Sequence, residues 1–202
     1  IDGWGLLTGP TSVDVKNAEG QVSSYTCDDL IVAAGATVRL VPGVTLSENV
    51  VTYEEQILDA NLPASIIIGG SGAIGVEFAY VMKNFGVDVT IVEFLDRMVP
   101  TEDADVSKEL LKHYKKLGVK VMLSTKVESV EDTGSGVKVT VSPAGGGDPQ
   151  VLEADRPLSA NGFAPPHQGD GLAGIGGAPP ARGALPRDSA RGTQLQKGHW
   201  GV

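Results

Sequence analysis

The clearest chemical signal in this sequence is the spacing G-x-G-x-x-G, formed by Gly70, Gly72 and Gly75. The first glycine allows a tight turn out of a strand, the second lets the backbone approach a phosphate, and the third lets a helix pack closely on the strand. The motif follows the apolar segment Ser65–Gly69, which is typical of a strand buried on both faces. The free N–H groups of a helix starting near Ala73 are then placed to bind a pyrophosphate.

A carboxylate follows the glycines at the distance that a dinucleotide site requires. Glu93 lies eighteen residues after the last glycine, at the end of the β-branched segment Val87–Val92. An acidic residue there binds the adenosine ribose hydroxyls. Its charge repels the 2′-phosphate of NADP, and Phe94 and Leu95 offer no cation, so we expect NAD. Arg97 is the one nearby cation, and we interpret it as a surface residue.

The alternative interpretation is a glycine-rich turn in an unrelated α/β protein, with Glu93 only a polar residue at a strand end. The spacing of small residues favours the dinucleotide site instead. Ala79 and Gly86 continue the positions where the helix would approach the sheet closely, and Gly86 is suited to end the helix as a C-cap.

Composition narrows the possible functions. The formal net charge is −9 and no basic stripe occurs, so a nucleic-acid partner is not expected. No apolar run approaches the length of a membrane span and no signal peptide is recognisable, which favours a cytoplasmic setting. Cys27 is the single cysteine and is predicted to be structural, and no metal site is expected. Because the chain begins with Ile1 rather than Met, we expect a piece of a longer protein.

The elements before the glycine motif are a hairpin, a strand and a short helix. Thr11–Lys16 and Gln21–Thr26 alternate apolar and polar residues, which predicts the hairpin. Leu30–Ala34 is uniformly apolar and predicts a buried strand. Thr52–Ala60 predicts a helix, which Thr52 and Glu55 begin as a capping box.

After the motif, Pro100–Gly118 predicts a second long helix that Thr101 can cap. Four further strands are expected, at Val119–Leu123, Lys126–Val130, Val137–Val141 and Val151–Ala154. The order predicts an α/β fold, a Rossmann-like dinucleotide-binding domain with a central parallel sheet and a β-meander, preceded by a β-hairpin. After about Asp155 the strand pattern is expected to fail, because Pro157 cannot donate to a ladder.

Several longer segments resemble the dihydrolipoamide dehydrogenases, flavin- and NAD-dependent enzymes of the pyridine nucleotide-disulfide oxidoreductase family. They are ENVVTYEEQIL, the glycine motif with GVEFA, DVTIVEFLDRMVP, EDADVSKEL, KKLGVKVMLSTKVESV and NGFAP. By this resemblance, about residues 1–165 are identified as an internal fragment of such an enzyme. The resemblance implies that the parent enzyme oxidises protein-bound dihydrolipoamide through a disulfide and FAD and passes a hydride to NAD.

The resemblance also implies cofactor contacts. Glu77 corresponds to an acidic residue near the nicotinamide and flavin, Val127 to a residue on the adenine side, and Gly162 to a glycine turn near the dinucleotide. Without the resemblance, Glu77 is interpreted as a carboxylate near a helix start, and Val127 and Gly162 are interpreted as core or turn residues. The expected NAD contacts are Gly70, Ser71, Gly72, Ala73, Ile74, Gly75, Val76, Glu77, Glu93, Val127 and Gly162. The expected FAD contacts are Gly5, Ala34, Gly35 and Ala36, where alanine at 34 replaces a hydroxyl-bearing family residue.

The residues that perform the family's chemistry are not found in this sequence. It has no Cys-x4-Cys pair, no second glycine motif for the FAD phosphates and no matching His-Glu dyad. We therefore expect no catalytic residue here and an inactive chain on its own.

Three parts are expected: a partial FAD-binding domain at 1–49, an NAD-binding domain at 50–164 and a tail at 165–202. Roughly a third of the residues after Phe163 are Gly or Pro, which predicts a tail that is disordered or translated out of frame. The resemblance implies a cytoplasmic homodimer that meets the lipoyl domains of 2-oxo acid dehydrogenase complexes. Two alternatives stay open: another flavin disulfide reductase, of the mercuric or glutathione reductase type, and an NAD-binding module without chemistry.

Overall fold

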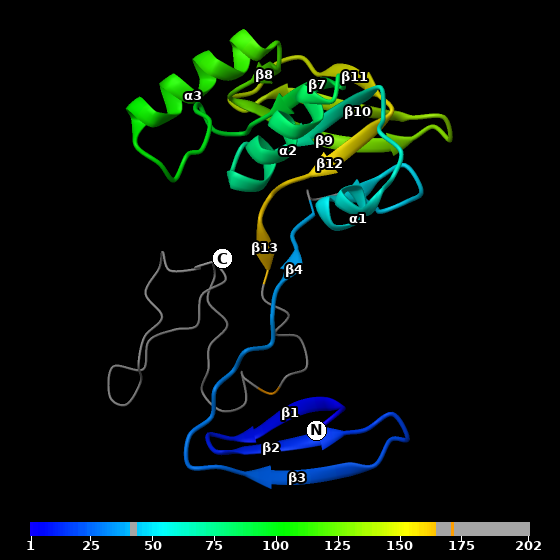
Figure 1. Cartoon of the computed structure of the whole chain (residues 1–202), viewed down its shortest axis with the longest axis vertical. Helices are drawn as coiled ribbons and strands as arrows, with labels where there is room; N and C mark the ends of the chain where they lie inside the picture. Colours follow the sequence, from blue (N-terminus) through cyan, green and yellow to red (C-terminus); the bar gives the residue numbers. More distant parts are fainter. Residues whose placement is uncertain (41–43, 165–170, 172–202) are drawn as a thin grey trace. The chain divides into compact units, whose positions relative to one another are not determined.

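The computed structural model describes residues 1–40, 44–164 and 171 (Figure 1). The chain forms two compact units, which we describe separately. Unit 1 contains Ile1–Thr37 and Phe163–Val202, and unit 2 contains Val38–Gly162. The prediction of a disordered or out-of-frame tail at 165–202 concerns residues that, except for Gly171, lie outside the described part of the chain.

Unit 1 contains a three-stranded antiparallel sheet in the order β1-β2-β3. Its strands are β1 (Trp4–Gly9), β2 (Ser12–Lys16) and β3 (Val22–Thr26). The predicted hairpin is confirmed, because β2 and β3 pair in the register that sets Ser12 opposite Thr26. The first strand was not predicted from its glycine-rich sequence. Most side chains of this sheet are exposed or half-buried, so the sheet has little core of its own.

One prediction for unit 1, a buried strand, is wrong. Leu30–Ala34 forms no strand, and Ile31 is 90% exposed rather than buried. An apolar segment becomes a buried strand only where another strand pairs with it, and none of the described residues does so here. Cys27, which was expected just before that buried strand, is exposed, and its Sγ donates to the backbone oxygen of Thr11 at 3.5 Å.

Unit 2 is built on a five-stranded parallel sheet in the order β5-β12-β6-β7-β8, as the sequence predicted for a dinucleotide-binding domain. Its strands are β5 (Val51–Thr52), β12 (Arg156–Ser159), β6 (Ser65–Gly69), β7 (Asp88–Val92) and β8 (Lys120–Met122).

A two-stranded sheet pairs β4 (Thr37–Val38) with β13 (Phe163–Ala164).

The expectation that no strand continues after Asp155 is wrong. Pro157 lies buried inside β12, between β5 and β6. It is tolerated because β5 is short and pairs only with Leu158 and Ser159, so the ladder on that side begins after the proline. A proline argues against a strand from its own chemistry alone, whereas the arrangement of the sheet decides whether a neighbouring strand pairs with that residue on each side.

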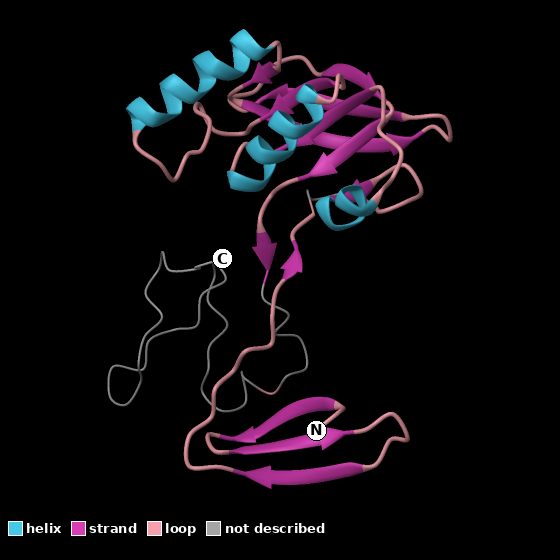
Figure 2. Ribbon diagram, in the orientation of Figure 1, coloured by secondary structure: helices cyan, strands magenta, loops and turns pink. Residues whose placement is uncertain are grey.

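The sheet has one face covered by helices and the other by the β-meander (Figure 2). Ile66 and Ile68 pack with the helices α2 (Ala73–Asn84) and α3 (Ala104–Leu117), whereas Ile67 packs with the meander. The meander is formed by β9 (Thr125–Asp132), β10 (Val137–Pro143) and β11 (Gln150–Ala154). Both faces of β6 are therefore buried, as its unbroken apolar sequence predicted.

The helix ends follow the sequence in one case and depart from it in another. Helix α1 (Tyr53–Leu58) has the predicted capping box, in which Thr52 accepts from the helix and Glu55 accepts from the Thr52 backbone N–H at 2.8 Å. Helix α3, by contrast, begins at Ala104 and not near Pro100. Val99 has φ +39° and donates its N–H to the backbone oxygen of Ser71 at 2.9 Å. The backbone of the N-cap residue Asp103 is extended, so the residues between Val99 and Ala104 form a loop rather than the first turn of α3. Among the described residues, no helix is long and apolar enough to cross a membrane.

Candidate dinucleotide-binding site

Two of the three motif glycines are required by the packing of the chain itself. Gly70 has φ +108°, and a Cβ added to it would lie 2.8 Å from the oxygen of Ala160. A Cβ added to Gly75 would lie 2.1 Å from the oxygen of Gly70. These contacts bring the first turn of α2 directly against the turn that leaves β6.

Gly72 has no such internal reason to be glycine. Its φ is −68°, which any residue adopts, and apart from its chain neighbours no described residue has an atom within 4 Å of an added Cβ. The open space above its backbone is what close approach of a ligand requires. Gly72 is thus the glycine whose role is best explained by a bound molecule.

The start of α2 offers N–H groups to such a molecule. Gly72 is the N-cap and provides no side-chain cap. The first intrahelical bond runs from Val76 N to Gly72 O at 3.0 Å. The N–H groups of Ala73, Ile74 and Gly75 therefore have no acceptor within the helix, and with the helix dipole they favour an anion such as a pyrophosphate.

Glu93 follows β7 and lies directly beneath the glycine turn. Its side chain is buried, with the whole residue 6% exposed. Oε2 accepts two hydrogen bonds from Ser71, from N at 2.8 Å and from Oγ at 2.7 Å, and Oε1 accepts one from Leu95 N at 2.8 Å. The structure therefore brings together the two sequence signals, the glycine turn and the carboxylate. The link through Ser71 was not foreseen, because a serine between two glycines carries no motif.

The other expected NAD residues lie around the carboxyl ends of the parallel strands. Val127 is half-buried on β9, whose first residue, Thr125, donates its N–H to the backbone oxygen of Glu93 at 2.9 Å. Gly162 has φ +76° and follows β12 closely, in the segment that contacts Gly70. Glu77 lies exposed on α2, while Val76 is buried beside it. These positions are compatible with the expected NAD contacts, but none of them has a conformation or an open space that itself indicates a ligand.

The expected FAD residues are not gathered into a site. Gly5 lies on β1, and Ala34, Gly35 and Ala36 lie in an extended segment of the same unit, all of them exposed. Gly35 has φ +78° and, like Gly5, no protein atom within 4 Å of an added Cβ. No hydrogen bond of the described residues joins the two groups. By themselves they do not form a pocket that fits FAD.

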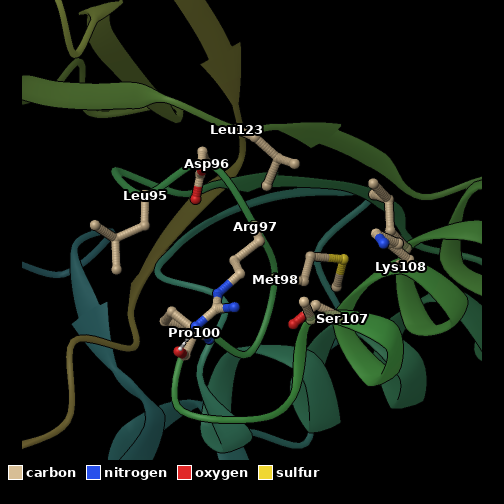
Figure 3. A pocket seen from close by; sticks show the side chains of 10 residues that line it. Leu95, Asp96, Arg97, Met98, Pro100, Ser107, Lys108 and Leu123 are labelled. Carbon is tan, nitrogen blue, oxygen red and sulfur yellow. Dashed lines mark hydrogen bonds between the residues drawn. The ribbon is translucent and has the colours of Figure 1, made fainter.

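A cavity of about 560 Å³ lies between the loop that follows β7 and the start of α3 (Figure 3). Arg97, which we interpreted as a surface residue, is half-buried in its lining and donates from Nη2 to the oxygen of Pro100 at 2.7 Å. The buried hydroxyl of Ser107 has no hydrogen-bond partner within the part of the chain that the structure describes. The remaining lining residues are Leu95, Asp96, Met98, Ala104, Lys108, Leu111 and Leu123. Sequence reasoning missed the cavity because no motif spacing marks it.

Among the described residues, no group of three or more His, Cys, Asp or Glu side chains is placed to hold a metal ion. His113, the histidine of the described part, is exposed on α3 and pairs with Glu109 at 3.1 Å.

Comparisons with known proteins show which family this chain resembles. The sequence profile described as "Pyridine nucleotide-disulphide oxidoreductase" matches residues 2–190. The chain is 52% identical over 195 residues to a dihydrolipoyl dehydrogenase of Mycobacterium tuberculosis, a match that covers 96% of this chain and 42% of that protein. It is 50% identical to a dihydrolipoyl dehydrogenase of Mycobacterium leprae, with the same shares covered. The profile match extends beyond residue 165, whereas the segments in which we found the family resemblance end at about that residue.

Solved structures show the same likeness. LpdA from Mycobacterium tuberculosis is similar with a TM-score of 0.76 and 30% identity, covering 90% of this chain and 39% of that one. The HOCl-induced flavoprotein disulfide reductase RclA from Escherichia coli is similar with a TM-score of 0.78 and 28% identity, covering 92% of this chain and 41% of that one. The chain thus spans about 42% of the length of the curated relatives it matches.

Proposed function

Because this chain belongs to the pyridine nucleotide-disulphide oxidoreductase family, we propose that it is the NAD-binding part of a dihydrolipoyl dehydrogenase. Enzymes of this kind use FAD and NAD. The whole protein oxidises protein-bound dihydrolipoamide, and the bound cofactors supply the hydride-transfer chemistry. It works as a cytoplasmic homodimer that serves 2-oxo acid dehydrogenase complexes through their lipoyl domains. The identity to dihydrolipoyl dehydrogenases supports this choice of reaction.

In this proposal the described residues bind and orient the dinucleotide. The N–H groups of Ala73, Ile74 and Gly75 hold the pyrophosphate, and Gly72 lets it come close. Glu93 accepts a hydrogen bond from the adenosine ribose, and its charge disfavours a 2′-phosphate. Val127 and Gly162 border the adenosine, and Glu77 lies toward the nicotinamide. Gly5 and Ala34–Ala36 contribute to an FAD site only together with residues that are not among those described here.

A single observation carries the proposal: Gly72 is glycine although neither its backbone angles nor its neighbours require it. Gly72→Val therefore keeps an allowed backbone conformation, and its Cβ meets no described residue other than its chain neighbours, so the fold is expected to persist. The added side chain occupies the space of the phosphates. Losing charge-assisted contacts of this kind weakens NADH binding by roughly tenfold to a hundredfold.

The test is a fluorescence titration of the purified chain with NADH. Gly145→Val is the matched control, because Gly145 is likewise free of positive φ and has no neighbour among the described residues within 4 Å of an added Cβ, but lies exposed in the turn after β10. We expect weakened binding in Gly72→Val and unchanged binding in Gly145→Val. Equal NADH affinity in both variants would refute the glycine-turn site.

A further inference from the structure

Ser71 links three segments of the dinucleotide site. It is fully buried. Its N and Oγ both donate to Oε2 of Glu93, and its backbone oxygen accepts from Val99 N at 2.9 Å. The serine thus connects the glycine turn, the carboxylate and the loop that leads to α3. Two hydrogen bonds from Ser71 and one from Leu95 N hold the Glu93 carboxylate in one orientation.

The same bonds limit what Glu93 can still accept. An ionised carboxylate has two oxygens with about four acceptor positions in total. Ser71 fills both positions on Oε2, and Leu95 N fills one on Oε1. A single acceptor position is left, and it is on Oε1. The adenosine ribose carries two neighbouring hydroxyls, so both cannot be accepted at once while Ser71 keeps its bonds.

We propose that Ser71 is a positioning residue that saturates Oε2 of Glu93, so that the carboxylate accepts only one of the two adenosine ribose hydroxyls. The inference rests on the proposed NAD site and makes it more specific. It predicts that one hydroxyl of the ligand contributes to affinity through Glu93 and that the other does not. Ser71→Ala opens one position on Oε2 while the backbone N–H of residue 71 still holds the carboxylate.

The experiment compares NADH with two analogues whose adenosine ribose lacks either the 2′-hydroxyl or the 3′-hydroxyl. With the unchanged chain, one analogue should bind roughly tenfold more weakly than NADH, and the other within about threefold of it. In Ser71→Ala both analogues should bind clearly more weakly than NADH, because the carboxylate, held on Oε2 by one bond instead of two, can turn and present an acceptor to each hydroxyl. A loss of stability alone would lower all three affinities together and leave these ratios unchanged.

Ser142→Ala is the matched control. Ser142 is also buried, at 8% exposed, and its Oγ donates to a glutamate carboxylate, Oε1 of Glu128, at 2.6 Å. This bond has the same chemistry but lies on the β-meander, between β9 and β10. We expect Ser142→Ala to keep the binding ratios of the unchanged chain.

The outcomes separate the inference from the function on which it rests. If the unchanged chain loses similar affinity for both analogues, or for neither, the inference is overturned without any variant being needed. It is also overturned if Ser71→Ala keeps the one-sided pattern. In both cases NADH still binds and Gly72→Val still weakens it, so the proposed NAD site stands. If NADH binds the unchanged chain and Gly72→Val alike, the proposed site fails and the inference falls with it.

Discussion

Gly75→Ala should destabilise the chain even though alanine is the better helix former. The added Cβ would lie 2.1 Å from the backbone oxygen of Gly70 and 3.4 Å from the Cβ of Ala160. Real Cβ contacts stay beyond 3.0 Å, so α2 must move away from the turn by roughly 1 Å. That movement disturbs the packing of Ala79 and Met82, which are 0% and 5% exposed.

The magnitude follows from two opposing effects. Overpacking a well-packed site costs about 1–3 kcal/mol and can cost more, while replacing glycine by alanine in a helix gains about 1 kcal/mol. The obstructing atom is a backbone carbonyl oxygen that cannot rotate away, so the upper part of the range applies. We expect the free energy of unfolding to fall by roughly 2 kcal/mol. Because the N–H groups at the start of α2 move with the helix, NADH binding should weaken as well.

The assay is urea denaturation followed by far-UV circular dichroism, with linear extrapolation to water. Gly145→Ala is the control, because alanine there meets no neighbour and reduces the freedom of the unfolded chain, which makes it neutral or stabilising by about 0.4–1 kcal/mol. If Gly75→Ala were as stable as Gly145→Ala, the close approach of helix and turn would be refuted as the reason for this glycine.

Two further variants test contacts outside the glycine turn. In the folded chain the pKa of Asp132 is lowered from 3.8 to about 2 by hydrogen bonds from the side chains of Asn49 and Ser47. Its contribution to stability is therefore complete above pH 3.8 and is lost as the pH falls toward 2. Urea midpoints of Asp132→Asn should fall less steeply over this range than those of the unchanged chain, and equal slopes would contradict the assignment. Tyr114→Phe removes the bond from the buried hydroxyl to the Val76 oxygen, 2.7 Å long, and should lower the free energy of unfolding by about 1 kcal/mol; an unchanged urea midpoint would show that this bond does not help to hold α3 against α2.

Predictions from sequence succeeded where the signal is local. The strand Ser65–Gly69, the turn of three glycines and the helix after it occupy consecutive positions, and their geometry follows from backbone preferences that each residue carries itself. The capping box of Thr52 and Glu55 is equally local, since both partners lie within one turn. The position of Glu93 could be predicted because the length of one helix and one strand sets its distance from the glycines.

Predictions failed where a residue's state depends on distant neighbours. Leu30–Ala34 has the composition of a buried strand but finds no pairing strand among the described residues. Pro157 fits into β12 because β5 does not extend beside it. Helix α3 begins only at Ala104, after a loop whose Val99 N–H donates to Ser71 in the distant glycine turn.

The sequence by itself determined the kind of site, because glycine spacing and a carboxylate at the next strand end are local and periodic features. Tertiary structure alone decided which residues of the site are hydrogen-bonded to one another and which remain open to a ligand. It placed Ser71, twenty-two residues before Glu93, within hydrogen-bond distance of the carboxylate, and it left Gly72 open while it closed the space around Gly70 and Gly75. Such contacts arise from the pairing of β6 with β7, which brings together residues that no local preference relates.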